Sequence, residues 1–319
     1  MPQLYVEGWA PEYGNPVETD EATVDRDSVD ELVEVPGRWD PITGADDGVT
    51  AVVFVDGVRR VDARLTIDEP DGPVPGICGS FGVGAVRWDR AVPRSDVAVT
   101  RVERLAVFGH GKGMPFPVAG PQLAYRTASV ADEDPRALIQ HFHGEMRKAE
   151  ARLSEELAQA GEFVVADGPI NDLSATEKVG YVKTHRAPYL SPAKAPIIGR
   201  LGMAERTPLF LIGADGRFPK YSWYFRLAEI ARGHSWSGVV RGEVSSHLTL
   251  ETARHIADRT TALLPLVASE AHVDPRAPQN LVPIAALERE LRRRLGDPAF
   301  VLRALRSAVM SLTTVGEPA

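Results

Sequence analysis

Two neighbouring patterns of apolar residues predict a helix followed by a buried strand in the middle of the chain. Over residues 135–160 the apolar positions step by three or four, as on one face of an amphipathic helix: Leu138, Phe142, Met146, Ala149, Leu153 and Leu157. Residues 163–166 then form a short apolar run bounded by glycines, which is typical of a buried strand. Asp167 follows this run, so we expect its carboxylate at the end of a rigid element.

Glu150 lies at the edge of the apolar face of this helix, in line with Met146 and Leu153. An isolated charge on a buried face is costly, so this carboxylate must be solvated, paired or bound to a cation. One interpretation is a boundary glutamate that pairs with Arg147 or Arg152. The other is a ligand of a positively charged group, which requires further carboxylates nearby.

A β-hairpin is predicted over residues 49–67. Residues 49–55 form a β-branched apolar run, and residues 58–67 alternate between apolar and polar positions. The two runs meet at Asp56-Gly57, and an Asp-Gly pair between such runs is a strong hairpin signal. On this pattern alone, Asp56 is a turn residue.

The same patterns predict a mixed α/β fold for the rest of the chain. Together with the hairpin, strands at 78–88 and 97–108 predict a meandering sheet of four or five strands. Further along we expect a strand at 178–186, a hairpin over 208–227, a strand at 237–244 and a helix over 249–269 that Pro265 kinks or shortens.

Two later segments carry positive charge. Tyr181, Lys183 and His185 share one face of the predicted strand at 178–186, because side chains alternate with a period of two. Such a face suits a phosphodiester, and an ordinary solvated strand face is the alternative. After Arg276, a helix carries the arginines whose face could follow a nucleic-acid backbone or pair with the chain's own carboxylates: Arg289, Arg292, Arg293 and Arg294.

Composition limits the class of protein. The 319 residues, 44% of them hydrophobic, have room for one large domain or two small ones. The formal net charge of −8 argues against a general polyanion binder but permits a local basic channel. Acidic residues dominate residues 1–46, which we expect to form a solvated arm with one short helix near residues 28–33.

The sequence also predicts where the protein resides. The single cysteine, Cys78, excludes an internal disulfide framework and a multi-cysteine zinc site, and it fits a reducing cytosol. The first residues have no basic segment followed by an apolar one, as a secretion signal would, and no apolar span approaches membrane length. We therefore expect a soluble cytoplasmic protein without a membrane partner.

Three carboxylates are predicted at the ends or faces of neighbouring elements: Asp56, Glu150 and Asp167. Hard divalent cations such as Mg²⁺ or Mn²⁺ prefer carboxylate, water and phosphate oxygens as ligands. One or two such ions orient a water, lower its pKa and neutralise charge at a scissile phosphate. Strand-end aspartates with a helix glutamate are how the RNase H-like fold builds such a site.

At these residues the chain resembles the NurA nucleases. The blocks that carry the resemblance are residues 54–57, 146–150, 164–168 and 179–184, in this order, and the similarity runs with gaps from about residue 49 to about residue 300. The resemblance implies an RNase H-like (PIWI-like) fold, with a mixed central sheet flanked by helices and additional β-hairpins. It places a nuclease domain over residues 47–319, after the acidic arm.

The resemblance also implies the activity and the partners. NurA nucleases use Mn²⁺ or Mg²⁺, form a ring-like homodimer and act on DNA ends with a hexameric HerA-type ATPase. Their metal-binding acids correspond to Asp56, Glu150 and Asp167 of this chain. In the C-terminal block, Glu288 stands where the family commonly has a histidine and Asn280 where it has a tyrosine, which indicates a bacterial-type branch.

The sequence thus predicts a metal-dependent DNA nuclease of end processing, repair or phage defence. Asp56, Glu150 and Asp167 would hold the metal, Glu288 would be a further ligand or a base, and Lys183 would bind phosphate. The predicted DNA path consists of Arg276, Arg292 and Arg293. The alternatives are a catalytically weakened dimeric adaptor for a DNA-translocating ATPase and a phosphatase-like hydrolase of nucleotides.

Overall fold

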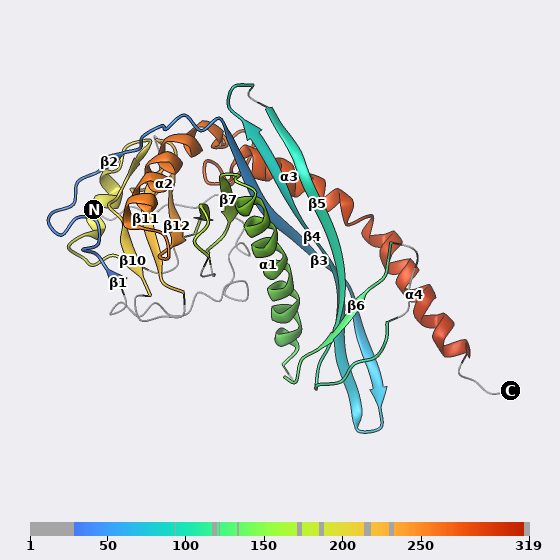
Figure 1. Ribbon diagram of the computed structural model, residues 1–319. Coiled ribbons are helices and arrows are strands. Elements are labelled where there is room, and N and C mark those ends of the chain that lie inside the picture. Colours follow the sequence, from blue (N-terminus) through green and yellow to red (C-terminus); the bar gives the residue numbers. More distant parts are fainter. Residues whose placement is uncertain are drawn as a thin grey trace. The chain divides into compact units, whose positions relative to one another are not determined.

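The computed structural model describes residues 29–92, 94–116, 120, 122–132, 134–170, 174–184, 188–213, 218–229 and 233–315 (Figure 1). Their strands form one twelve-stranded mixed sheet flanked by helices, which confirms the predicted mixed α/β class. The chain divides into two units. Unit 1 comprises Met1–Val55, Val86–Asp96 and Ala151–Ala286, and unit 2 comprises Asp56–Ala85, Val97–Glu150 and Leu287–Ala319.

The elements follow one another along the chain as β1 (Val29–Asp30), β2 (Ile42–Thr43), β3 (Ala51–Glu69), β4 (Gly72–Asp89), β5 (Arg94–Phe108), β6 (Arg126–Ser129), α1 (Pro135–Gln159), β7 (Val164–Asp167), β8 (Lys178–Val182), η3 (Ala195–Arg200), β9 (Glu205–Arg206), β10 (Phe210–Ile212), β11 (Lys220–Arg226), β12 (Val239–Ser245), α2 (Leu250–Leu263), η4 (Leu264–Val267), α3 (Val282–Arg294) and α4 (Pro298–Val315).

The sheet of unit 1 combines antiparallel and parallel strands. Strands β10, β11 and β12 pair antiparallel, and β12 continues antiparallel to β8. From there β8, β7 and the first part of β3 run parallel to one another. Parallel strands are buried on both faces, which explains why β7 and β8 are continuous apolar runs rather than alternating ones.

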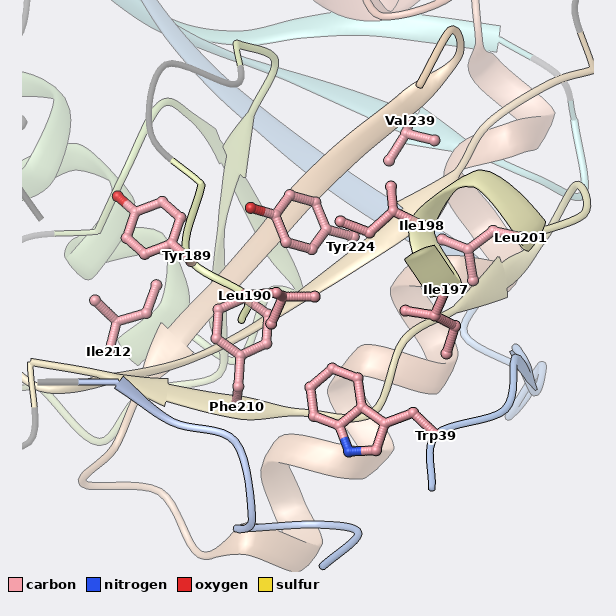
Figure 2. Packing of buried hydrophobic residues seen from close by; sticks show 10 residues of the cluster. All are labelled: Trp39, Tyr189, Leu190, Ile197, Ile198, Leu201, Phe210, Ile212, Tyr224 and Val239. Carbon is pink, nitrogen blue, oxygen red and sulfur yellow. The ribbon is translucent and has the colours of Figure 1, made fainter. Parts of the chain in front are cut away.

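An aromatic cluster forms a core of unit 1 (Figure 2). Phe210 of β10 stacks on Tyr224 of β11 at a ring-centroid distance of 5.7 Å, and Trp39 approaches the same Phe210 at 6.4 Å. The 3₁₀ helix η3 contributes Ile197 and Ile198, both buried. The predicted hairpin over 208–227 is therefore confirmed as β10 and β11, whereas its turn at Asp215-Gly216 lies outside the described residues.

The described end of the acidic segment is anchored to unit 1 by a buried carboxylate. Glu34 accepts two hydrogen bonds from the guanidinium of Arg206, at 2.9 and 3.0 Å, and one from Arg254 at 3.0 Å. Only 3% of the Glu34 side chain and 1% of the Arg206 side chain are exposed. A solvated face was therefore the wrong interpretation for Glu34. The short helix predicted near residues 28–33 is also wrong, because Val29–Asp30 pairs as a strand with β10.

The hairpin turn predicted at Asp56-Gly57 is wrong. Strand β3 runs unbroken through both residues to Glu69, and the turn follows at Pro70-Asp71, before Gly72 with its positive φ of 122°. Pro-Asp-Gly is itself a turn sequence, so two Asp-Gly signals competed. The second one forms the turn because Val52–Asp56 and Val58 are buried strand positions, where a surface turn has no place.

Helices cover both faces of β4 in unit 2. A Cβ atom on Gly79 would lie 2.5 Å from the ring of Phe142, so α1 packs directly on the backbone there. A Cβ atom on Gly84 would lie 3.1 Å from the side chain of Leu291 of α3. Residues 79 and 84 point to opposite faces because side chains alternate along a strand. These strand glycines therefore admit a helix on each side of β4.

A buried polar cluster joins β3 to the end of α3. The carboxylate of Asp62 is fully buried and accepts hydrogen bonds from Arg60 at 2.8 Å, from Tyr125 at 2.8 Å and from Ser80. Arg60 and Arg104 in turn donate to the carbonyl oxygen of Leu295, each at 3.2 Å. The last carbonyls of a helix have no partner within it, so these arginines cap α3.

The helices of the C-terminal part differ in two respects from those that the sequence predicts. The predicted helix over 249–269 ends at Leu263 and continues as the 3₁₀ helix η4, which contains Pro265. Thr249 caps its start by accepting a hydrogen bond from the backbone N–H of Thr252. Helix α4 was not predicted. None of the helices in the described part of the chain combines the length and apolar character that a membrane crossing requires.

The Glu34–Arg206 pair predicts a pH-dependent stability. Burial raises the pKa of Glu34, but hydrogen bonds and charges from Arg206, the backbone N–H of Leu209 and Arg254 outweigh it and hold the pKa below its ordinary value of 4.5. A carboxyl with a lowered folded-state pKa stabilises the fold above its unfolded pKa, and the contribution disappears as the pH falls through the folded value. We expect Glu34→Gln to lower the free energy of unfolding by about 1.5–3 kcal/mol at pH 7, since it removes a charged hydrogen-bond partner and leaves the buried arginine with only the second of its two carboxylates, Asp258.

The measurement is urea unfolding of both proteins from pH 7 down to pH 3. The difference between wild type and Glu34→Gln should shrink below about pH 4.5. Asp40→Asn is the matched control, because Asp40 and its partner Arg38 are exposed, and we expect it to change stability little. A Glu34→Gln protein as stable as the wild type at pH 7 would contradict the assignment.

Candidate metal centre

Asp167 is positioned by the end of strand β7. Its backbone pairs with Tyr181 of β8, and the chain then turns at Gly168, whose φ is +104°. Gly168 still donates its N–H to the carbonyl of Tyr181 at 2.9 Å, which continues the ladder past the aspartate. The predicted strand-end position of Asp167 is confirmed, and 16% of its side chain is exposed.

The β3–β7 ladder brings Asp56 next to Asp167. In this parallel pair Val53 lies opposite Val164 and Val55 opposite Ala166. The residues that follow Val55 and Ala166 are Asp56 and Asp167. Their proximity therefore follows from backbone register, not from the path of any loop. Asp56 is 7% exposed and accepts a hydrogen bond from the N–H of Gly57 at 2.7 Å.

Glu288 of helix α3 contributes the third carboxylate. Asp56, Asp167 and Glu288 each offer one oxygen, and these oxygens all lie within 4.8 Å of one another. The Glu288 side chain is 13% exposed and lies 3.8 Å from Arg292, one helical turn further on. The sequence assigned Glu288 only an auxiliary role, whereas the structure places it in the central group.

Glu150 of helix α1 contacts the strand backbone next to Asp56. A Cβ atom on Gly57 would overlap the Oε1 atom of Glu150, so the helix carboxylate rests on the strand backbone next to Asp56. Gly57 is therefore required for close approach and not for a turn. This finding gives Asp56-Gly57 a structural reason that the hairpin interpretation missed.

Lys183 stands at the other side of Asp167. Its ammonium group donates to Oδ2 of Asp167 at 2.5 Å and to Oδ1 of Asn280 at 3.0 Å. Asn280 is fully buried, and its amide nitrogen donates to Oδ2 of Asp274 at 2.7 Å. Asp274 thus determines the orientation of the amide, with its oxygen towards Lys183. Tyr181 lies under the ammonium, 5.9 Å from its ring centroid, which confirms the face shared by residues 181 and 183.

Asp274 is itself held as a carboxylate. Burial raises its pKa, but hydrogen bonds from Arg276 and Asn280 outweigh burial and lower it below the ordinary value of 3.8. Hydrogen bonds therefore link four side chains in the order Asp274, Asn280, Lys183 and Asp167. Their charges are negative, neutral, positive and negative in this order. Asn280 and Asp274 were not predicted as site residues. The sequence signal for Asn280 was its position in the C-terminal block, where the NurA nucleases commonly have a tyrosine. Asp274 had no such signal.

The donor set fits a hard divalent cation. All three ligand atoms of the group are carboxylate oxygens, without the imidazole or thiolate that zinc and copper sites favour. At an effective dielectric constant of about 20, two like charges 4 Å apart repel by about 4 kcal/mol. Lys183 and Arg292 offset part of this repulsion, and a divalent cation would offset more of it.

Each arginine that was predicted to form a DNA path contacts a different carboxylate of the chain. Arg276 forms an ion pair with Asp274 at 3.2 Å in unit 1. Arg292 faces Glu288, and Arg293 bonds Glu290 at 2.7 Å, both on α3. Pairing with the chain's own carboxylates, the alternative that the net charge favoured, is therefore found for all three. His185, predicted on the strand face of Lys183, lies outside the described residues.

The contact between Gly57 and Glu150 yields a test of this geometry. Gly57→Ala must displace the Glu150 carboxylate, while the fold changes little because the displaced group is the end of a flexible side chain. We expect the affinity for Mn²⁺, measured by isothermal titration calorimetry, to fall by about tenfold or more. Gly144→Ala is the control, since a Cβ atom there meets nothing within 4 Å. Equal Mn²⁺ affinity in both variants would show that Glu150 has no part in the site.

Comparison with known proteins gives likeness only at the level of structure. No protein-family model matches the sequence, and no curated protein matches it either. The chain is similar to the NurA nuclease from Sulfolobus solfataricus, with 11% identity, a TM-score of 0.45 and coverage of 88% of each chain. It is also similar to the catalytic domain of human Endonuclease V, with 16% identity, a TM-score of 0.29 and coverage of 78% of this chain and 84% of that one.

Proposed function

We propose that this protein is a Mn²⁺- or Mg²⁺-dependent deoxyribonuclease. The observation that carries the proposal is the convergence of carboxylate oxygens from Asp56, Asp167 and Glu288 within 4.8 Å. These residues come from two parallel strands and a helix that are far apart in the sequence. Their oxygens share one small space, which is the arrangement of carboxylate ligands that Mg²⁺ and Mn²⁺ prefer.

The remaining residues have roles that follow from their contacts. A bound divalent ion would lower the pKa of a water and offset charge at the scissile phosphate. Asp56 and Asp167 would hold it, Glu150 would complete its surroundings, and Glu288 would be a further ligand or accept a proton. Lys183 would donate to a phosphate oxygen, because Asn280 keeps its ammonium at the edge of the site.

The partners are proposed from the resemblance of the sequence blocks. We place the protein in DNA end processing, repair or phage defence, as a homodimer that works with a hexameric HerA-type ATPase. A cytoplasmic location agrees with its single cysteine, Cys78, which is buried and whose pKa burial raises to about 12. The adaptor alternative differs in one respect, because an adaptor needs no bound metal.

Loss of a single carboxylate should abolish cleavage. We expect Asp56→Asn and Asp167→Asn to reduce Mn²⁺-dependent cleavage of linear DNA by more than about a hundredfold, since losing even an outer-shell partner of a metal site costs about 10–100-fold. The assay is gel electrophoresis of labelled DNA with and without EDTA. Asp71→Asn is the matched control, because Asp71 also precedes a glycine but lies in the exposed turn after β3. Undiminished cleavage by either site variant would rule out the assignment.

A double-mutant cycle should show that Lys183 and Asn280 act as one unit. We expect Lys183→Met to lower kcat by about a hundredfold and Asn280→Leu by about tenfold, with KM little changed, because both remove transition-state stabilisation. The double variant should be no slower than Lys183→Met alone, since Asn280 acts through the lysine.

The cycle distinguishes positioning from simple support of the fold. If Asn280 only stabilised unit 1, its effect on kcat would persist without Lys183, and the two losses would multiply. Thermal unfolding of each variant provides the control for folding. Lys112→Met is the matched surface variant, because Lys112 is exposed and pairs only loosely with Glu69, at 3.6 Å.

A further inference from the structure

Unit 2 contains a polar groove of about 910 Å³ beside the end of helix α3. Three segments form its walls. Strand β5 contributes Thr100 and Arg104, residues 122–126, which run into β6, contribute Gln122 and Arg126, and α3 contributes Arg293 and Arg294, with Gly296 after it. Glu103 is the acidic residue of the lining, which makes the groove basic in a chain whose net charge is −8.

Arg104 holds the three walls together. Its guanidinium donates to the carbonyl of Gln122 at 2.8 Å, to the carbonyl of Leu295 at 3.2 Å and to the hydroxyl of Ser80. Its side chain is 8% exposed, so this charge is fixed in the floor of the groove. The groove is therefore a built feature of unit 2, because a largely buried arginine joins its three walls.

The other three arginines are available to a ligand. Side-chain exposure is 54% for Arg126, 71% for Arg293 and 45% for Arg294. Arg293 and Arg294 share one partner, Glu290, and Arg126 pairs with Glu145. Exposed ion pairs of this kind contribute little to stability, so a phosphate can replace the carboxylate at small cost.

Helix α3 connects this groove to the metal centre. Glu288 and Arg294 lie six residues apart on one helix, which is about 9 Å along its axis. That distance corresponds to roughly two to three base steps of a nucleic-acid strand, at about 3.4 Å per step. Six residues also turn the helix by about 600°, so the two side chains leave it about 120° apart, and a strand that passes from Glu288 to the arginines must follow the helix round as well as along it.

We propose that this groove binds the sugar-phosphate backbone of the nucleic acid next to the cleaved bond. The inference rests on the proposed nuclease function and extends it to Arg104 and Arg126, which the sequence did not assign. The lining residues described by the structure include no aromatic ring, whereas stacking on aromatic rings is how proteins grip bases of single strands. Recognition here is through phosphates and is independent of sequence.

Binding in EDTA tests the groove without cleavage. We would measure fluorescence anisotropy of a labelled 30-base-pair DNA of arbitrary sequence, from 50 to 200 mM KCl. For Arg293→Gln/Arg294→Gln we expect about tenfold weaker binding at 50 mM KCl. The slope of log affinity against log salt should fall in magnitude by about 2, because each lost phosphate contact removes about 0.9. Arg126→Gln, from another wall, should weaken binding in the same direction.

The matched control is Arg303→Gln/Arg306→Gln, which removes the same charge from exposed positions of α4 in the same unit. Its affinity and salt slope should remain close to those of the wild type. Equal effects of the two double variants would overturn the proposal that DNA binds in the groove, because net charge alone would then explain binding. Unchanged binding by the groove variants, with cleavage lost only in Asp56→Asn, would reject the groove and leave the nuclease assignment intact. Arginine-dependent binding by a wild type that cleaves nothing with Mn²⁺ would support the groove and reject the nuclease assignment.

Discussion

The parallel backbone ladder between β3 and β7 is the constraint on which the candidate site depends. Its register sets Val55 opposite Ala166, and each of these residues precedes an aspartate. Main-chain hydrogen bonds thus hold two carboxylates side by side, against their mutual repulsion, before any ligand is considered. A register shifted by one residue would turn one of the aspartates to the other face of the sheet. The apolar residues that determine this register therefore also determine that the two aspartates lie side by side.

Close approach of a helix to a strand supplies the next part of the site. Gly57 has no side chain, and the carboxylate of Glu150 occupies the space that a Cβ atom would need. In the neighbouring strand β4, glycines likewise leave room for Phe142 on one face and Leu291 on the other. Glycines in these strands consequently determine how near the helices come. One of those helices, α3, carries Glu288 and the basic groove at its end.

Buried charge is distributed throughout this acidic chain. Glu34 with Arg206, Asp62 with Arg60 and Arg104, and Glu243 with Lys220 are carboxylates satisfied by cations inside the fold. Such pairs contribute little net stability compared with apolar residues, but removing one partner is costly. They therefore specify which segments meet. The group around Asp167 differs from them because oxygens of three carboxylates lie together, and a metal ion there would offset their mutual repulsion.

The sequence by itself determined the elements whose signals are local. The helix before Asp167, the buried strand that carries it and the hairpin of β10 and β11 follow from apolar periodicity, and the carboxylates of the site were among the predicted residues. Tertiary structure decided what local patterns leave open: the Asp-Gly pair that makes the turn, the burial of Glu34 and the clamp of Asn280 on Lys183. It also placed Glu288 in the central group and Glu150 beside it. The physical reason is that periodicity reports which face of an element is buried, whereas the partner that a polar side chain meets lies on a segment far away in the sequence, 97 residues for Asn280 and Lys183 and 172 for Glu34 and Arg206.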